Sequence, residues 1–245
     1  MAEMLTCPGP TKSFPGFCPQ GIALLRTLKR KRPNQWLESQ QEMYKVKITT
    51  PLLDLVCSVS REFARFAPNY ATLPAKAVFR VFGATAGSRR IPPAAIWVHK
   101  DVKGMRGACF YFHFTEKEAV VLGGMYSAEA DELLAVRKLL QEQYLQFATI
   151  LADHRLKSVV GELRGEMLSR MPYGFSSSHP AADFLRHKQW YVATMLDMNL
   201  ISTDRLMPTL VGHFEAMAPL VEFLNRPFCQ SGKSKKPVVR SFPTS

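Results

Sequence analysis

One short segment of the chain combines an aromatic run with groups that can bind a ligand or accept a proton. Residues 110–114 read Phe-Tyr-Phe-His-Phe. Successive side chains of a β-strand point to opposite faces, so Tyr111 and His113 share one face and the three phenylalanines share the other. We expect the phenylalanines to face the core. Tyr111 and His113 then either line a groove or are ordinary half-exposed residues.

Arg80 is a second candidate, because it lies in an apolar segment whose alternation predicts partial burial. A buried arginine needs a partner. A salt bridge is the simpler interpretation, and an anion site is the alternative, since a guanidinium group holds two oxygens at once. The candidate ligand-binding residues taken together are Arg80, Tyr111, His113, Arg170, His179 and Lys188.

Motifs for metal binding and for catalysis are not found in the sequence. His179 and Asp183 are four residues apart, which places both on one face of a short helix. A zinc site needs three or four ligands, so a capping arrangement at the helix N-terminus is the favoured interpretation. The chain has no phosphate-binding glycine loop, zinc-protease motif or nucleophile elbow. We therefore predict no metal and no cofactor, and the sequence identifies no catalytic residue.

The charge of the chain is strongly positive and unevenly distributed. The net charge is +12, of which residues 1–110 carry +11, residues 111–225 carry −4 and the last twenty carry +5. Such asymmetry favours an anionic ligand or nucleic acid as partner, although basic domains without such a partner are common. Cations at the end of a helix also complement its dipole. The candidate anion patch comprises Lys29, Arg30, Lys31, Arg32, Arg89 and Arg90.

Composition places the chain among ordinary globular proteins. Its 245 residues are 47% apolar and 21% charged, which is sufficient for a buried core. No apolar run approaches the roughly 18 residues that cross a bilayer, and the N-terminus does not read as a signal peptide. The five cysteines are widely spread without a metal or disulfide pattern, so we expect a reducing, cytoplasmic location and no membrane partner.

Hydrophobic periodicity predicts an α+β order of elements. Helices are expected from Pro19 to Pro33, over 34–44 and 51–66, from an N-cap at Ser127 to 151, from 155 to 163, over 180–187, and from 202–203 to 224. Strands are expected over 77–82, 94–99, 108–115, 119–126 and 189–196. The three-residue connection between the third and fourth of these strands predicts an antiparallel hairpin.

These elements predict one α+β domain in which an antiparallel sheet containing a hairpin packs with several helices. We place the domain at residues 19–228. An irregular N-terminal arm covers 1–18, and a basic, disordered tail covers 229–245. Gly123 and Gly124 indicate either a β-bulge or a close backbone approach.

Several blocks of sequence resemble one family along nearly the whole chain. They include Phe79-Arg80-Val81, Gly107-x-x-Phe110-Tyr111-Phe112-His113, Gly123-Gly124-Met125-Tyr126, Gly165-Glu166-x-Leu168-x-Arg170-x-Pro172-x-Gly174-Phe175 and His179-Pro180-x-x-Asp183. The chain resembles the bacterial and fungal family catalogued as domain of unknown function 2461. The resemblance supports the fold class and implies no reaction. It also marks a divergence, because the loop from Gly83 to Ala95 lacks the charged residues that family members carry there.

Three functions remain open on the sequence alone. The favoured hypothesis is a binding or interaction module with a basic face for an anionic ligand or partner. The alternative is an enzyme acting on a small molecule, such as a phosphorylated one, with its activity lost in this divergent chain. The third is a structural or partner-binding remnant without a site.

Overall fold

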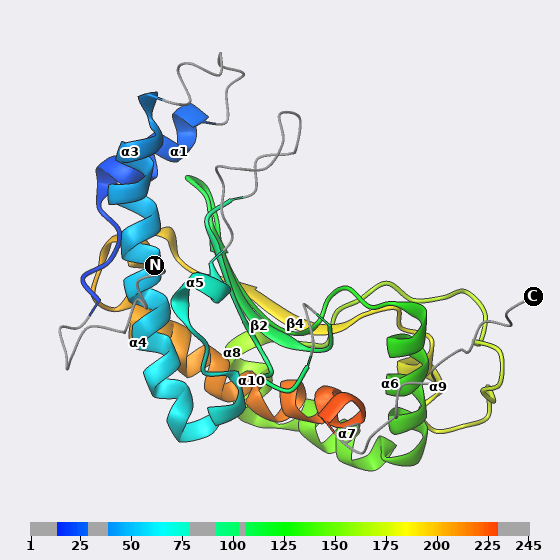
Figure 1. The fold of residues 1–245 in the computed structure, drawn as a ribbon. Coiled ribbons are helices and arrows are strands. Elements are labelled where there is room, and N and C mark those ends of the chain that lie inside the picture. Colours follow the sequence, from blue (N-terminus) through cyan, green and yellow to red (C-terminus); the bar gives the residue numbers. More distant parts are fainter. Residues whose placement is uncertain (1–13, 29–38, 79–91, 103–105, 230–245) are drawn as a thin grey trace, which may run out of the picture.

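The computed structural model describes residues 14–28, 39–78, 92–102 and 106–229 (Figure 1). Four antiparallel strands form one sheet in the order β1-β2-β3-β4. The strands are β1 (Ala94–Val98), β2 (Cys109–Phe114), β3 (Ala119–Met125) and β4 (Trp190–Met195). Strands β2 and β3 form the predicted hairpin, with Phe114 opposite Ala119. The α+β prediction is confirmed.

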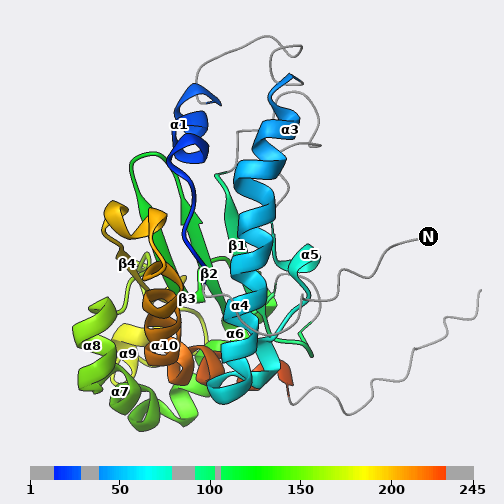
Figure 2. The same cartoon turned by 90° about the vertical axis from the view of Figure 1, so that its left-hand side faces the viewer.

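One face of the sheet packs against two long helices, α4 (Thr50–Phe66) and α10 (Leu206–Cys229). Figures 1 and 2 show both helices on the same side of the strands. The alternation predicted for β2 is observed, because Phe110, Phe112 and Phe114 are fully buried while the residues between them are half-buried. The period-two pattern of the sequence thus decides which face of the sheet becomes core.

Aromatic rings join the sheet to these helices. The Phe214 ring of α10 lies 5.3 Å from Phe110 and 5.2 Å from Trp97, and the Phe63 ring of α4 lies 5.0 Å from Phe110, measured between ring centroids. The Trp97 indole N–H donates to Ser60 Oγ at 3.1 Å, so the one polar atom of that ring is satisfied within the core.

Gly123 explains how closely α10 approaches the sheet. A β-carbon at this position would lie 2.6 Å from Met217 Sδ and 2.8 Å from Met217 Cβ. The register of β2 with β3 and of β3 with β4 is continuous through Gly123 and Gly124. Of the two alternatives for this glycine pair, the structure therefore shows a close approach and no bulge.

The remaining helices pack around the sheet and its two long helices. The shorter elements are α1 (Pro19–Leu28), α3 (Gln41–Tyr44), η1 (Lys45–Thr49), η2 (Pro68–Tyr70), α5 (Pro74–Ala77), α6 (Ala130–Glu142), α7 (Tyr144–Ala152), α8 (His154–Val160), α9 (Ala182–Leu185) and η3 (Met198–Ser202). In the described part of the chain, no helix is both long and apolar enough to cross a bilayer.

Three local predictions are corrected. The N-cap of α6 is Glu129 and not Ser127, since the Glu132 carboxylate accepts the Glu129 N–H at 2.8 Å. The helix expected to continue to residue 151 is divided at Gln143, whose backbone leaves the helical region. Ala77, expected in a strand, ends α5, and Val78 forms an isolated bridge to Ala95. The rest of that expected strand lies outside the described residues.

We predict that Gly123→Ala lowers the free energy of unfolding by about 1–3 kcal/mol, because the added methyl group overlaps the Met217 side chain at its root. Urea denaturation measures the change. The matched control is Gly212→Ala in the same helix as Met217, where an added β-carbon meets nothing within 4 Å. That control should be neutral or stabilising by about 0.5–1 kcal/mol. Equal effects of both substitutions would contradict the close-approach explanation.

Candidate functional site

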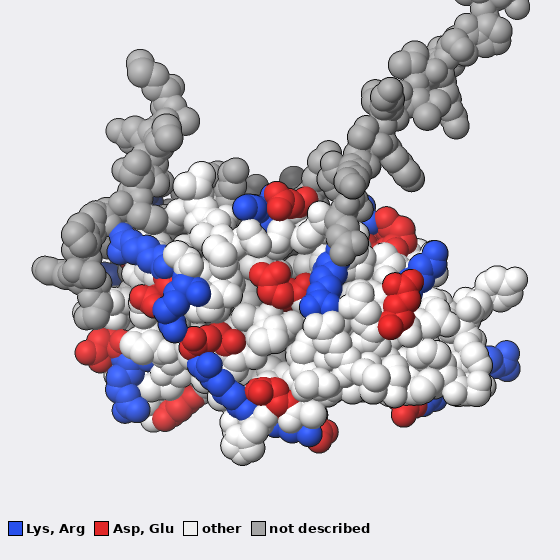
Figure 3. Space-filling model, turned by 90° about the horizontal axis from the view of Figure 1, so that it is seen from below, with Lys and Arg blue, Asp and Glu red and all other residues white. Residues whose placement is uncertain are grey.

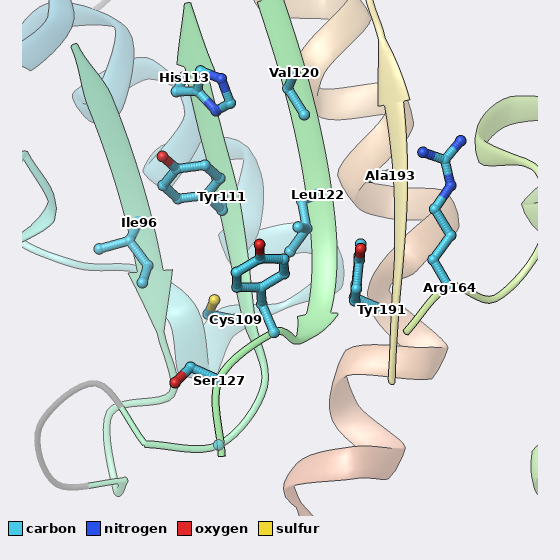
Figure 4. A pocket seen from close by; sticks show the side chains of 12 residues that line it. Ile96, Cys109, Tyr111, His113, Val120, Leu122, Ser127, Arg164, Tyr191 and Ala193 are labelled. Carbon is cyan, nitrogen blue, oxygen red and sulfur yellow. The ribbon is translucent and has the colours of Figure 1, made fainter. Parts of the chain in front are cut away.

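The face of the sheet that carries no phenylalanine of β2 is hollowed into a pocket of about 520 Å³. Figure 4 shows the side chains that line it, most of them from the four strands. The lining residues are Ile96, Gly107, Cys109, Tyr111, His113, Val120, Leu122, Tyr126, Ser127, Arg164, Tyr191 and Ala193.

The strand register arranges most of this lining in three rows across the sheet. The middle row pairs Ile96 with Tyr111, Tyr111 with Leu122, and Leu122 with Ala193. The second row runs from Ala94 through His113 and Val120 to Met195, and the third from Val98 through Cys109 and Gly124 to Tyr191. The floor is therefore mainly apolar, and its polar groups stand at separate, fixed positions.

His113 supplies an imidazole to one end of this floor. Its Nδ1 is buried and has no hydrogen-bond partner among the described residues, and its Nε2 lies 3.9 Å from Glu118 Oε1. Burial lowers the pKa of His113, while the nearby Glu118 carboxylate opposes the shift. The ring is consequently neutral at pH 7 and can both donate and accept a hydrogen bond.

Cys109 and Tyr111 present groups that keep their protons. Burial raises the pKa of the Cys109 thiol to about 12, and that of Tyr111 also to about 12. A thiol of this kind is a weak nucleophile, because only the thiolate attacks. Both side chains therefore suit contact with a ligand better than chemistry on it. A second aromatic corner is formed by Tyr126 and Tyr191, whose rings meet edge to face at 5.1 Å.

Arg164 reaches the pocket from the segment after α8. Its N–H donates to the Tyr191 carbonyl at 2.7 Å, and the Tyr191 N–H donates back at 3.3 Å. The segment thus adds a short antiparallel bridge to the outer edge of β4. The next residue, Gly165, has φ +146° and lies directly against the Gln189 carbonyl, so a side chain there would prevent this approach.

Buried polar groups form hydrogen bonds to the backbone at Gly107 and Ala108, where the chain enters β2 beside the pocket. The Gly107 N–H donates to Glu132 Oε1 at 2.8 Å. The Asn225 amide of α10 accepts the Ala108 N–H and donates to the Ala108 carbonyl, both at 2.8 Å. The same amide donates to the Tyr70 hydroxyl at 2.7 Å. Asn225 is fully buried, so these bonds fix the entry into β2 from the core side.

The candidate ligand-binding residues do not all meet. Tyr111 and His113 line the pocket together, 5.4 Å apart between ring centroids. His179 Nδ1 accepts the Ala181 N–H at 3.0 Å beside α9, and Lys188 Nζ lies 3.1 Å from Glu166 Oε2. Arg170 is exposed, and none of these last three lines the pocket.

The other predicted residues cannot be placed, and three lining residues were not predicted. Arg80 and the anion patch of Lys29, Arg30, Lys31, Arg32, Arg89 and Arg90 lie outside the described residues. Arg164, Tyr126 and Tyr191 were not predicted as site residues, and backbone pairing joins Arg164 to Tyr191 from distant parts of the chain. The Gly123-Gly124-Met125-Tyr126 block was the available signal for Tyr126.

Most of the net charge falls outside the described residues. The segments 1–13, 29–38, 79–91, 103–105 and 230–245 contain thirteen of the lysines and arginines but two of the acidic residues, a net of +11 out of +12. On the face drawn in Figure 3, basic and acidic side chains of the described part are interspersed. That part also contains no group of three His, Cys, Asp or Glu side chains able to hold a metal ion.

We predict that Asn225→Leu destabilises the domain by about 2–4 kcal/mol, because it leaves the buried Ala108 N–H and carbonyl without partners. Chemical denaturation gives the difference. Asn199→Leu, at an exposed position, is the control and should change stability by less than about 0.5 kcal/mol. A small loss for Asn225→Leu would show that the amide is not required at the entry into β2.

The lowered pKa of His113 predicts a pH dependence of stability. The unfolded chain protonates near the ordinary histidine pKa of 6.5, whereas the folded protein resists protonation until lower pH. Stability is therefore full above this range and declines as the pH falls from 7.5 towards 5.5. His113→Gln should show a smaller decline, measured by urea denaturation at both pH values. His187, whose pKa burial also lowers, accounts for part of the remainder. Parallel pH profiles of the two proteins would contradict this assignment.

Comparison with known proteins gives one match. No curated protein and no solved structure matches the chain. The model of the family described as "Conserved hypothetical protein (DUF2461)" matches residues 20–223, which include all four strands of the sheet and every residue that lines the pocket. The chain belongs to this family.

Proposed function

We propose that this domain is a small-molecule binding protein whose site is the pocket on the open face of the sheet. The observation that carries the proposal is the pocket itself, a hollow of about 520 Å³ over a mainly apolar floor with few polar groups. Pockets for organic ligands are typically about 300–1,000 Å³, largely apolar, and carry a small number of placed polar groups.

The side chains of the floor suit a ligand with an apolar, flat body. Leu122, Val120 and Ala193 lie side by side on β3 and β4, and Ile96 flanks them across Tyr111. Tyrosine rings stand at two corners, where they can contact the edge or the face of a ligand ring. Neutral His113 supplies one of the few hydrogen-bonding positions of this mainly apolar surface.

Binding is favoured over an enzymatic reaction by the protonation of these groups. The Cys109 thiol and the Tyr111 hydroxyl both keep their protons at neutral pH, so neither is an activated nucleophile or base. The proposal therefore retains a binding module as the preferred hypothesis and assigns the binding to the sheet instead of to a basic face.

The proposal includes a reducing compartment, the cytoplasm, as the place of action. The four cysteines in the described part of the chain, Cys18, Cys57, Cys109 and Cys229, are free thiols. Free thiols in several unrelated environments fit a reducing cytosol better than an oxidising compartment.

The test measures binding of the neutral dye N-phenyl-1-naphthylamine, whose fluorescence rises in an apolar site. We expect saturable binding to the wild-type protein. Ala193→Phe places a ring in the middle row beside Leu122, so it should weaken binding by at least about tenfold. Circular dichroism and the urea midpoint establish that the variant is folded.

The matched control is Ala64→Phe, which adds the same ring at an exposed position of α4, away from the pocket lining. It should bind the dye as the wild-type protein does. No saturable binding by the wild-type protein, or undiminished binding by a folded Ala193→Phe variant, would overturn the proposal.

A further inference from the structure

We propose that the ligand of this pocket is an amphipathic organic acid, whose anionic group pairs with Arg164 while its apolar body lies on the sheet. This inference rests on the proposed function and adds the chemical class of the ligand. The anionic group is a carboxylate or a similar small oxyanion, because a guanidinium group binds two such oxygens with parallel hydrogen bonds.

Arg164 is held at the edge of the pocket by its backbone. The two hydrogen bonds between Arg164 and Tyr191, at 2.7 and 3.3 Å, fix the main chain of the arginine against β4. Figure 4 shows its side chain running alongside that strand, on the far side of Ala193 from Leu122. The guanidinium group therefore stands at the margin of the apolar floor, where an acid group can remain near water while its body is buried.

The charges around the pocket leave Arg164 available. Three cations that do not line the pocket are paired with carboxylates, since Lys188 contacts Glu166, Arg186 contacts Asp183, and Arg106 contacts Asp131. Arg164 makes no ion pair with any described residue within 4.0 Å. Among the described residues that line the pocket there is no aspartate or glutamate, and His113 is neutral at pH 7, so Arg164 carries the one formal charge of this described lining. The site is electrostatically suited to an anion.

The spacing of the strands indicates the size of the apolar body. Adjacent strands lie about 4.8 Å apart, so the floor from Ala193 on β4 across Leu122 to Tyr111 on β2 is about 10 Å wide. A body of two fused or linked rings, or a chain of similar length, spans this distance. Its far end then meets Tyr111 and the neutral imidazole of His113, which can satisfy one neutral polar group.

The experiment compares two probes that differ in one group. 8-Anilinonaphthalene-1-sulfonate has the ring system of N-phenyl-1-naphthylamine with an added sulfonate. Arg164→Gln should raise the Kd of the sulfonate about threefold to tenfold and leave the Kd of the neutral dye unchanged. The control, Arg170→Gln, removes an exposed arginine that does not line the pocket and should alter neither Kd. Added salt should weaken sulfonate binding more for wild-type protein than for Arg164→Gln.

The outcomes separate this inference from the proposed function. If both dyes bind, Ala193→Phe weakens both, and Arg164→Gln alters neither, the pocket stands and the acid class is wrong. An equal loss of both dyes in Arg164→Gln also overturns the inference, because it would show that the arginine contributes by packing. If neither dye binds the wild-type protein, both the proposed function and this inference fail.

Discussion

The contact between α10 and β3 at Gly123 is the constraint on which the rest of the structure depends. The helix lies so close to the sheet that Met217 occupies the space of a β-carbon. Phe214 of the same helix thereby reaches Trp97 and Phe110, and Asn225 reaches the backbone at the entry into β2. One helix therefore closes the core and sets the position of the central hairpin. Because that packing occupies one face, the pocket lies on the opposite face.

The open face contains groups that a purely structural surface does not require. A one-sided antiparallel sheet usually exposes charged and polar residues that are satisfied by water. Here, the middle row is Ile96, Tyr111, Leu122 and Ala193, and the buried Nδ1 of His113 has no described partner. Apolar surface left in a hollow and a polar atom left unpaired each cost stability, on the order of 1–3 kcal/mol for the polar atom. A ligand that covers the hollow would remove the cost of the exposed apolar surface.

The alternation and spacing of apolar residues predicted most helices and strands, but they did not predict which side chains meet in the pocket. The alternation in residues 110–114 predicts which side chains of β2 face the core, and the hairpin follows from the short connection to β3. Arg164 could not be predicted in this way, because it joins the pocket through backbone pairing with Tyr191, twenty-seven residues later. Asn225 follows directly on the helix predicted to end at residue 224, and only the packing of α10 makes it a partner of Ala108. The cap at Ser127 was misjudged because Glu132 satisfies the Glu129 N–H instead.

The net charge of the chain does not by itself locate a ligand site. The basic residues predicted as an anion patch lie outside the described residues, and the described part of the chain is nearly balanced in charge. What distinguishes Arg164 is the lack of an acidic partner in the described part, combined with an apolar surface beside it. Arg164 is itself exposed, so water and salt screen its charge, and the apolar hollow beside it is what would add to the binding of an organic acid. The proposed recognition of an organic acid therefore depends on the combination of an unpaired arginine and an adjacent apolar hollow, and not on the total charge of the chain.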